Sequence, residues 1–172
     1  MTGIVERLRN IGRRSAFVIL IALGVLLATA GVFTTVFERE LSEHRAVSEA
    51  GRRALEAAKS SVPETLSYDF NTVDRQLEAA ANNLTGKFRA DFTTLSSSVI
   101  VPAARRDSIV TTAQVAEGGV ISADAGTVTL LLFLNQNTTS TKYEGPRLDG
   151  SRIRVTMTKV DENWLISDLV PV

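Results

Sequence analysis

The chain has 172 residues with a formal net charge of zero at pH 7, and 44% of its residues are hydrophobic. It contains no cysteine, which excludes a disulfide framework and thiolate chemistry. Because His44 is the only histidine, the common nucleophile–base arrangements are almost excluded as well. The balanced charge leaves no basic patch of the kind that binds nucleic acid.

Residues Ser15 to Phe37 form an uncharged, strongly apolar run that predicts a transmembrane helix. A helix of this length is about 34 Å long, against about 30 Å for the hydrocarbon core of a bilayer. The segment before it (1–14) carries one acid and four arginines, which are Arg7, Arg9, Arg13 and Arg14. By the positive-inside rule this tail stays in the cytoplasm and the residues after the span are exported. We therefore expect a single-pass protein of the inner membrane whose C-terminal domain is periplasmic or otherwise extracytoplasmic.

A cleaved signal peptide is the alternative interpretation of this segment. Ala28-Thr29-Ala30 matches an A-x-A cleavage pattern and follows the apolar stretch from Phe17 to Leu27. An uncleaved anchor is favoured, because apolar residues continue beyond that pattern at Val32, Phe33, Val36 and Phe37.

Residues Glu38 to Ser60 predict a juxtamembrane helix that continues out of the membrane, with Pro63 marking its end. The segment is rich in Ala, Glu, Arg and Leu, and opposite charges recur at four-residue spacing. Mostly small side chains form a narrow stripe along it, at Val47, Ala50, Ala54 and Ala58. Such a stripe lets another element approach closely, so it either packs on the rest of its own domain or forms a seam for a partner subunit.

Residues 61–172 are interpreted as one exported domain that begins with helices. A second helix is predicted over Asn71–Leu84, and a third over Lys87–Val99, which Pro102 stops. One face of the third helix is apolar, because it collects Phe88, Phe92, Leu95 and Val99.

After the helices the pattern changes to that of β-strands. Gly118-Gly119 predicts a hairpin turn, and Asn137–Gly150 predicts a polar loop. The strand Thr127–Gln136 is too apolar for a solvated face, so we expect it at the centre of a sheet. The predicted strands are Ser108–Glu117, Val120–Ala123, Thr127–Gln136, Arg152–Val160 and Trp164–Val170. Helices followed by antiparallel strands predict an α+β fold in which a bent sheet wraps the helices.

Motifs that would carry chemistry are missing from the sequence, which has no phosphate-binding loop and no metal-ligand spacing. One candidate site is Tyr68-Asp69-Phe70, because an aspartate beside a tyrosine could act as base and hydrogen-bond donor in a pocket between helices and sheet. The structural alternative is that the two aromatic residues anchor the segment while Asp69 ties down a turn. We predict no catalytic residues, no cofactor and no metal, and hence a protein that is not an enzyme.

A polar cluster follows the apolar strand and begins with Asn135 and Gln136. Its side chains either cap the end of the sheet and hold the next loop, or contact a partner, since loops held by a rigid strand often carry contacts.

Several segments in this order resemble the Mce-associated membrane proteins of actinobacteria. The resemblance covers the apolar span and nearly all of the exported domain. The segments are Leu66-Ser67-Tyr68-Asp69-Phe70, Leu84-Thr85-Gly86, Val101-Pro102-Ala103, Leu132-Phe133-Leu134-Asn135-Gln136, Val155-Thr156-Met157-Thr158-Lys159 and Trp164-Leu165-Ile166-Ser167-Asp168-Leu169. Glu162 departs from the pattern, because a glycine is expected in the last hairpin turn.

The resemblance implies a short cytoplasmic tail, one transmembrane helix and a cystatin-like (nuclear-transport-factor-two-like) cone of three helices on a bent antiparallel sheet. Such a domain is also similar to the periplasmic domains of type IV secretion assembly factors. The implied role is that of an accessory subunit that assembles or stabilises an Mce-type lipid transport system. Its implied partners are Mce transporter subunits or the permease, and membrane lipid, with a homo-oligomer left open.

Two other functions stay open at this point. A lipid-binding module would need an apolar pocket of its own, on the order of 300 Å³ or more. An enzyme of the ketosteroid-isomerase type would need Asp69 or another acid buried in that pocket. No acid occurs within Val128–Leu134 or Ile153–Val160, which argues against the enzyme.

Overall fold

The computed structural model describes residues 45–172. The predicted cytoplasmic tail (1–14) and membrane span (15–37), together with its cleavable alternative, lie outside the described residues. Between residues 45 and 172, no helix has both the length and the apolar character needed to cross a membrane. Residues Ala46–Val172 form one compact unit by their internal contacts, and we call this unit the domain.

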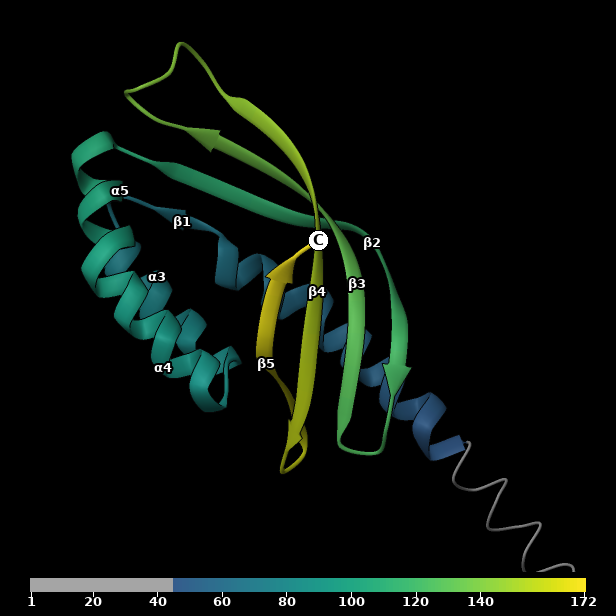
Figure 1. Ribbon diagram of the computed structural model, residues 1–172. Coiled ribbons are helices and arrows are strands. Elements are labelled where there is room, and N and C mark those ends of the chain that lie inside the picture. The colour runs from purple at the N-terminus through teal and green to yellow at the C-terminus, as the bar shows by residue number, and fades with distance from the viewer. Residues whose placement is uncertain (1–44) are drawn as a thin grey trace, which may run out of the picture. The chain divides into compact units, whose positions relative to one another are not determined.

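The sheet of the domain has five strands in the order β1-β2-β3-β4-β5, and every neighbouring pair is antiparallel (Figure 1). The strands are β1(Tyr68–Asp69), β2(Val110–Ala123), β3(Thr127–Thr139), β4(Arg147–Val160) and β5(Asn163–Pro171). The apolar strand β3 is central, as predicted, and has β2 and β4 on its two sides. The predicted loop after it was too long, because β3 and β4 stay paired as far as Thr138 and Arg147.

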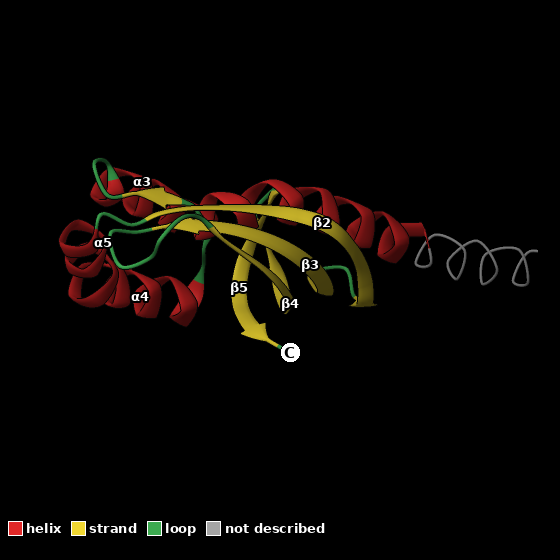
Figure 2. Cartoon of the chain, turned by 90° about the horizontal axis from the view of Figure 1, so that it is seen from above, coloured by secondary structure: helices red, strands yellow, loops and turns green. Residues whose placement is uncertain are grey.

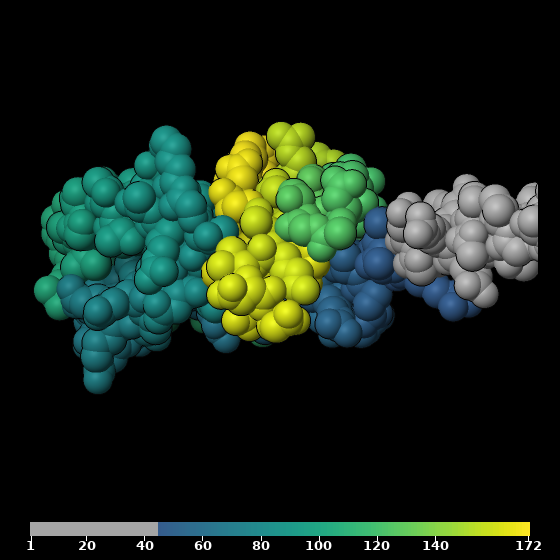
Figure 3. Space-filling model, turned by 90° about the horizontal axis from the view of Figure 1, so that it is seen from below, coloured from purple at the N-terminus to yellow at the C-terminus, as the bar shows by residue number. Residues whose placement is uncertain are grey.

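Three helical stretches of the described residues accompany the sheet. The first, over residues 45–66, is called the long helix, and it lies along one face of the strands in the view from above (Figure 2). The others are α3(Val73–Ala80) with η1(Ala81–Asn83), and α4(Gly86–Leu95), η2(Ser96–Ile100) and α5(Val101–Asp107) in direct succession. Figure 3 shows these later helices, in teal, beside the green and yellow ends of the strands. The predicted α+β architecture is confirmed for the domain.

The core lies between the long helix, α3 and the inner face of the sheet. Alternate residues of β3 are buried there, as the two-residue period of a strand requires. The buried residues of the cluster include Ala50, Ala54, Ala58, Val62, Val73, Leu77, Leu130, Leu132, Leu134, Ile153, Val155, Met157 and Ile166. The sheet and the helices therefore share one continuous apolar core.

Two helices continue through the prolines that were predicted to end them. The long helix passes Pro63 and runs to residue 66. Pro102 lies in the first turn of α5, where a missing N–H is tolerated. Just before it, η2 is a π-helical turn in which the N–H of Val101 bonds to the carbonyl of Ser96. This wider turn shifts the hydrogen-bond register, so the helix accepts the proline without ending.

The predicted hairpin at Gly118-Gly119 is wrong, because β2 runs through both glycines without turning. Gly118 is paired with Leu132 of β3, between two irregularities in the β2–β3 register. A side chain on Gly118 would overlap with Leu132 Cδ2 and come within 3.3 Å of Leu55 Cδ1 on the long helix. Glycine is needed at this position because the neighbouring side chains pack too closely for a Cβ atom, and not because the chain turns here.

Gly118→Ala should therefore lower the free energy of unfolding by about 1–3 kcal/mol, the usual cost of overfilling a packed core. Gly119→Ala is the matched control, because its added methyl group would meet no atom within 4 Å. Urea denaturation of both variants checks the prediction. Equal stability of the two would contradict a packing role for Gly118.

The last hairpin turns without the glycine that the family pattern suggested at position 162. Asp161 adopts the left-handed conformation, with φ of 54°, and Val160 pairs with Asn163 across the turn. Aspartate tolerates this conformation better than most residues, so Glu162 needs no unusual backbone.

Candidate functional site

A cleft of about 790 Å³ lies between the helices α4, η2 and α5 and the inner face of the sheet. Its apolar lining comes mostly from the helices, and its polar lining comes mostly from the strands and the loop after β3. The lining residues that matter below are Leu66, Tyr68, Phe88, Asp91, Phe92, Leu95, Ile100, Asp107, Gln136, Thr138, Ser140, Lys142, Asp149 and Leu169. The volume exceeds what a lipid-binding pocket requires.

The cleft exists because the two surfaces that border it do not match. The inner face of β3 is apolar as far as Leu134, but the next inward residues are Gln136 and Thr138. Opposite Gln136 on β4 stands Asp149. The facing helix offers apolar side chains to this polar part of the sheet, and Leu95 stays 50% exposed. Of the predicted apolar face of this helix, only Phe92 is buried, and Val99 is 54% exposed.

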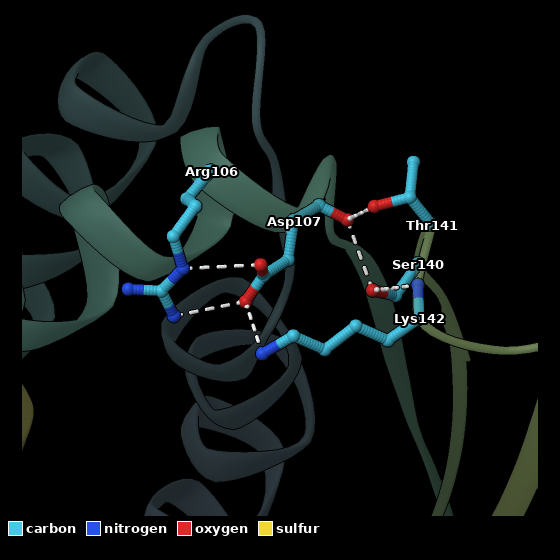
Figure 4. Close-up of polar contacts among 5 residues, drawn as sticks. All are labelled: Arg106, Asp107, Ser140, Thr141 and Lys142. Carbon is cyan, nitrogen blue, oxygen red and sulfur yellow. Dashed lines mark hydrogen bonds and ion pairs between the residues drawn. The ribbon is translucent and has the colours of Figure 1, made fainter.

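Asp107, the last residue of α5, lines the cleft and is the centre of a polar network that joins α5 to the loop after β3 (Figure 4). Its carboxylate accepts hydrogen bonds from Arg106 Nε and Nη2 at 3.1 and 3.0 Å, and Lys142 Nζ lies 2.8 Å from Oδ2. Its backbone carbonyl accepts bonds from Ser140 Oγ, Thr141 N and Thr141 Oγ1, each at 2.9 Å. The network fastens the loop between β3 and β4 to the helix.

The two cations set the protonation state of Asp107. Although the residue is only 7% exposed, the hydrogen bonds from Arg106 and Lys142 lower the pKa of its carboxyl from 3.8 to about 2. It is therefore ionised at any physiological pH. A carboxylate with so low a pKa is a weak base near neutrality, which suits a structural ion pair better than proton transfer.

This network should make the stability of the domain depend on pH in the acid range. Because the pKa of Asp107 is lowered on folding, its contribution is complete above about pH 4 and is lost as the pH falls toward 2. Wild type should therefore be more stable than Asp107→Asn at pH 6, and the difference should shrink steadily between pH 4 and 2. Urea unfolding at several pH values measures it. A difference that is constant down to pH 2 would contradict the assigned network.

The predicted site Tyr68-Asp69-Phe70 is divided by the structure. Tyr68 lines the cleft, but Asp69 does not. Asp69 Oδ1 accepts hydrogen bonds from the backbone N–H and the side-chain amide of Asn71, both at 2.8 Å. The backbone N–H of Phe70 bonds to the carbonyl of Ile109. Asp69 thus ties down a turn, which is the structural alternative stated above.

The stripe of small residues on the long helix faces the core of its own domain. Ala50, Ala54 and Ala58 are buried, and Val47 is half-buried. Asn135 and Gln136 lie within β3, as in the predicted strand, but β3 continues to Thr139, so they do not cap the end of the sheet. Successive side chains of a strand point to opposite faces. Gln136 accordingly lines the cleft, while Asn135 is exposed on the outer face.

The outer face of the sheet carries a second group of residues, which are exposed or half-buried. Leu131 and Phe133 alternate with the buried residues of β3, and Phe133 is 43% exposed. Arg154 is paired with Leu131, and Arg152 with Phe133, across the β3–β4 ladder. The long helix packs on the opposite face, because Leu130 and Leu132 of β3 share the core cluster with its Ala50 and Ala54. We call Leu131, Phe133, Arg152 and Arg154 the outer patch.

Sequence reasoning missed both Asp107 with Lys142 and the outer patch. The two charged residues are far apart in the sequence and meet only because the loop after β3 folds over the end of α5. The outer patch did leave a signal, because the alternation of β4 placed Arg154 on the face opposite Ile153 and Val155.

No family model matches the chain. It is 32% identical over 155 residues to the uncharacterized protein Rv1362c of Mycobacterium tuberculosis strain H37Rv, covering 90% of this chain and 70% of the relative. It is 35% identical over 123 residues to the outer membrane protein Rv1973 of the same strain, covering 72% of this chain and 76% of the relative.

Solved structures show the same fold at low sequence identity. An IcmL-like type IV secretion system protein from Legionella pneumophila superposes with a TM-score of 0.57 at 13% identity, over 67% of this chain and 88% of that chain. The periplasmic domain of DotI superposes with a TM-score of 0.57 at 14% sequence identity, over 69% of this chain and 91% of that domain. CagV, a VirB8 homolog of the type IV secretion system of Helicobacter pylori, superposes with a TM-score of 0.54 at 10% sequence identity. The match covers 68% of this chain and 94% of CagV. The expected similarity to periplasmic domains of type IV secretion proteins is confirmed at the level of the fold.

Proposed function

This chain belongs to the same family as Rv1362c and the outer membrane protein Rv1973 of Mycobacterium tuberculosis, and from that premise we propose that it is an accessory protein of the cell envelope. It assembles or stabilises a transport system through protein contacts and performs no turnover of its own. The name of Rv1973 supports the envelope location. The shared fold with DotI and CagV, which belong to secretion assemblies by their names, supports the accessory role.

The finer part of the proposal is that the transport system is of the Mce type and moves lipid. The resemblance of the six sequence segments to Mce-associated proteins supports this assignment. The N-terminal span anchors the chain in the inner membrane, with its tail in the cytoplasm and its domain outside. Transporter subunits or the permease are the partners.

The outer patch is the observation that carries the contact role. The stripe on the long helix is buried, so it offers no surface to a partner in this conformation. The outer patch instead combines an exposed phenylalanine with two arginines, and aromatic and arginine side chains are enriched at the centres of protein interfaces. Because Arg152 and Arg154 flank the apolar residues, the partner surface should combine apolar and acidic groups.

Affinity purification of the full chain from native membranes tests this role. Phe133→Asp places a like charge opposite an acidic partner and should reduce the recovery of partner subunits by about tenfold or more, as loss of an interface hot spot does. Val99→Asp is the matched control, because Val99 is also about half exposed but belongs to η2 on the helical side. Equal recovery with both variants would remove the outer patch from the proposal. Recovery of other envelope proteins in place of Mce subunits would refute only the Mce assignment.

A second candidate function is lipid binding by the domain itself. The cleft favours it, because its volume of about 790 Å³ and its apolar helical wall meet the requirement that was stated from the sequence. The ketosteroid-isomerase alternative gains no comparable support. Asp69 lies outside the cleft. Of the acids that line it, Asp107 is bound by two cations, and Asp91 and Asp149 are exposed rather than buried.

A further inference from the structure

We propose that the cleft binds a single-chain lipid with an anionic head, its hydrocarbon chain lying along α4 and η2 and its head group at Lys142. The proposal deepens the lipid-binding candidate above and rests on it, whereas it is independent of the contact role of the outer patch. It assigns both the class of ligand and the direction in which the ligand lies.

The helical wall provides the place for the hydrocarbon chain. Phe88, Phe92 and Leu95 come from α4, and Ile100 from the end of η2. Leu95 remains 50% exposed within this wall. Covering such apolar surface with a hydrocarbon chain is favourable, because it removes the surface from water. The volume of about 790 Å³ accommodates one acyl chain.

The charges around the cleft favour an anionic head at one particular end. Arg106 and Lys142 both bind the single carboxylate of Asp107, which leaves one positive charge in excess at that group. Lys142 lines the cleft, and its side chain remains largely exposed, so its other N–H groups are accessible to a ligand. Asp107 meanwhile holds the ammonium group in place at 2.8 Å.

The other charged residues of the lining do not compete for this position. Asp91 forms an ion pair with Lys87 on the same helix. Asp149 stands opposite Gln136, where the described residues show no cation paired with it. Lys142 is the only cation among the described residues that line the cleft, so a carboxylate head is drawn to it rather than to Asp149. The distribution of charge therefore orients the ligand.

Photolabelling of the full chain, purified in detergent, tests the inference with two lipids that share one chain. The probes are diazirine-bearing analogues of oleate and of monoolein, and crosslinked peptides are identified by mass spectrometry. Both probes should label peptides of α4, η2 and β5 that border the cleft. Leu95→Asp should reduce this labelling by about tenfold for both probes, because it places a charge in the apolar wall. Val99→Asp is the control, since Val99 has similar exposure but does not line the cleft.

The head group is tested by a second pair of variants. Lys142→Gln should reduce labelling by the oleate analogue by about fivefold and leave labelling by the monoolein analogue unchanged. Only the oleate analogue has a carboxylate that can pair with the lysine, so only its binding is weakened by the substitution. Lys142→Arg should restore oleate labelling, which separates the charge from a general loosening of the loop. Lys59→Gln removes the same charge from an exposed position on the long helix, outside the cleft, and should have no effect.

Three results would overturn the inference. Equal labelling of Leu95→Asp and Val99→Asp would show that the chain does not lie in the cleft. Crosslinks confined to residues 1–44 would show the same. Equal losses for both probes in Lys142→Gln, or no loss, would refute the anionic head. Partner recovery in the purification experiment is a separate measurement, so failure here leaves the accessory role standing.

Discussion

The double substitution Ala50→Leu with Ala54→Leu is expected to destabilise the domain by at least about 2 kcal/mol, because overfilling a packed core costs about 1–3 kcal/mol for each added side chain. Both alanines are buried in the core cluster. The long helix lies close to the sheet here, since Gly51 beside them would place a Cβ only 3.4 Å from Val120 Cγ2. Two leucines cannot enter this space without moving the helix away from the strands.

Urea unfolding of a fragment from Glu38 to Val172 measures this effect, and we expect the fragment to fold because Ala46–Val172 is compact by its own contacts. Ala46→Leu is the matched control, because Ala46 lies on the same helix but is exposed. It should change stability by less than about 0.5 kcal/mol. Unchanged stability of the double variant, together with lost partner recovery, would instead make the stripe a seam for a partner subunit.

Phe92→Ala should cost about 3–5 kcal/mol, which is a large share of the stability of a typical domain. Phe92 is 9% exposed and is the buried aromatic residue of α4. Removing its ring leaves a cavity where α4 packs on the core.

Phe133→Ala is the control for this prediction, because it removes the same phenylalanine ring from an exposed position. Phe133 is 43% exposed on the outer face, so its truncation should cost less than about 1 kcal/mol of unfolding free energy. Both values come from chemical denaturation of the same fragment. A cost below 1 kcal/mol for Phe92→Ala would refute its place in the core. A large cost for Phe133→Ala would show that the outer patch stabilises the fold.

Patterns carried by one segment alone were sufficient to predict most elements. The uninterrupted apolar run in β3 predicted a strand at the centre of the sheet. In β4, Ile153, Val155 and Met157 alternate with polar residues in the sequence, and these three are the residues that are buried. These predictions succeed because the period of hydrophobic residues follows from the geometry of a single strand or helix. The role of Asp69 in a turn could also be predicted from the sequence, because its hydrogen-bond partner Asn71 is only two residues away.

The sequence by itself therefore determined the α+β class, the order of helices before the main strands and the central place of β3. Only the tertiary structure decided the meaning of residues whose effect depends on distant neighbours. From the sequence Gly118 is predicted to lie in a turn, whereas in the structure it leaves room for the side chains of Leu132 and Leu55. The stripe of small residues on the long helix predicts that another element packs closely against it, but it does not identify that element. The cleft, and the ion pair of Asp107 with Lys142 at its end, arise where helices and strands from different parts of the chain meet, and such long-range contacts leave no local periodicity to read.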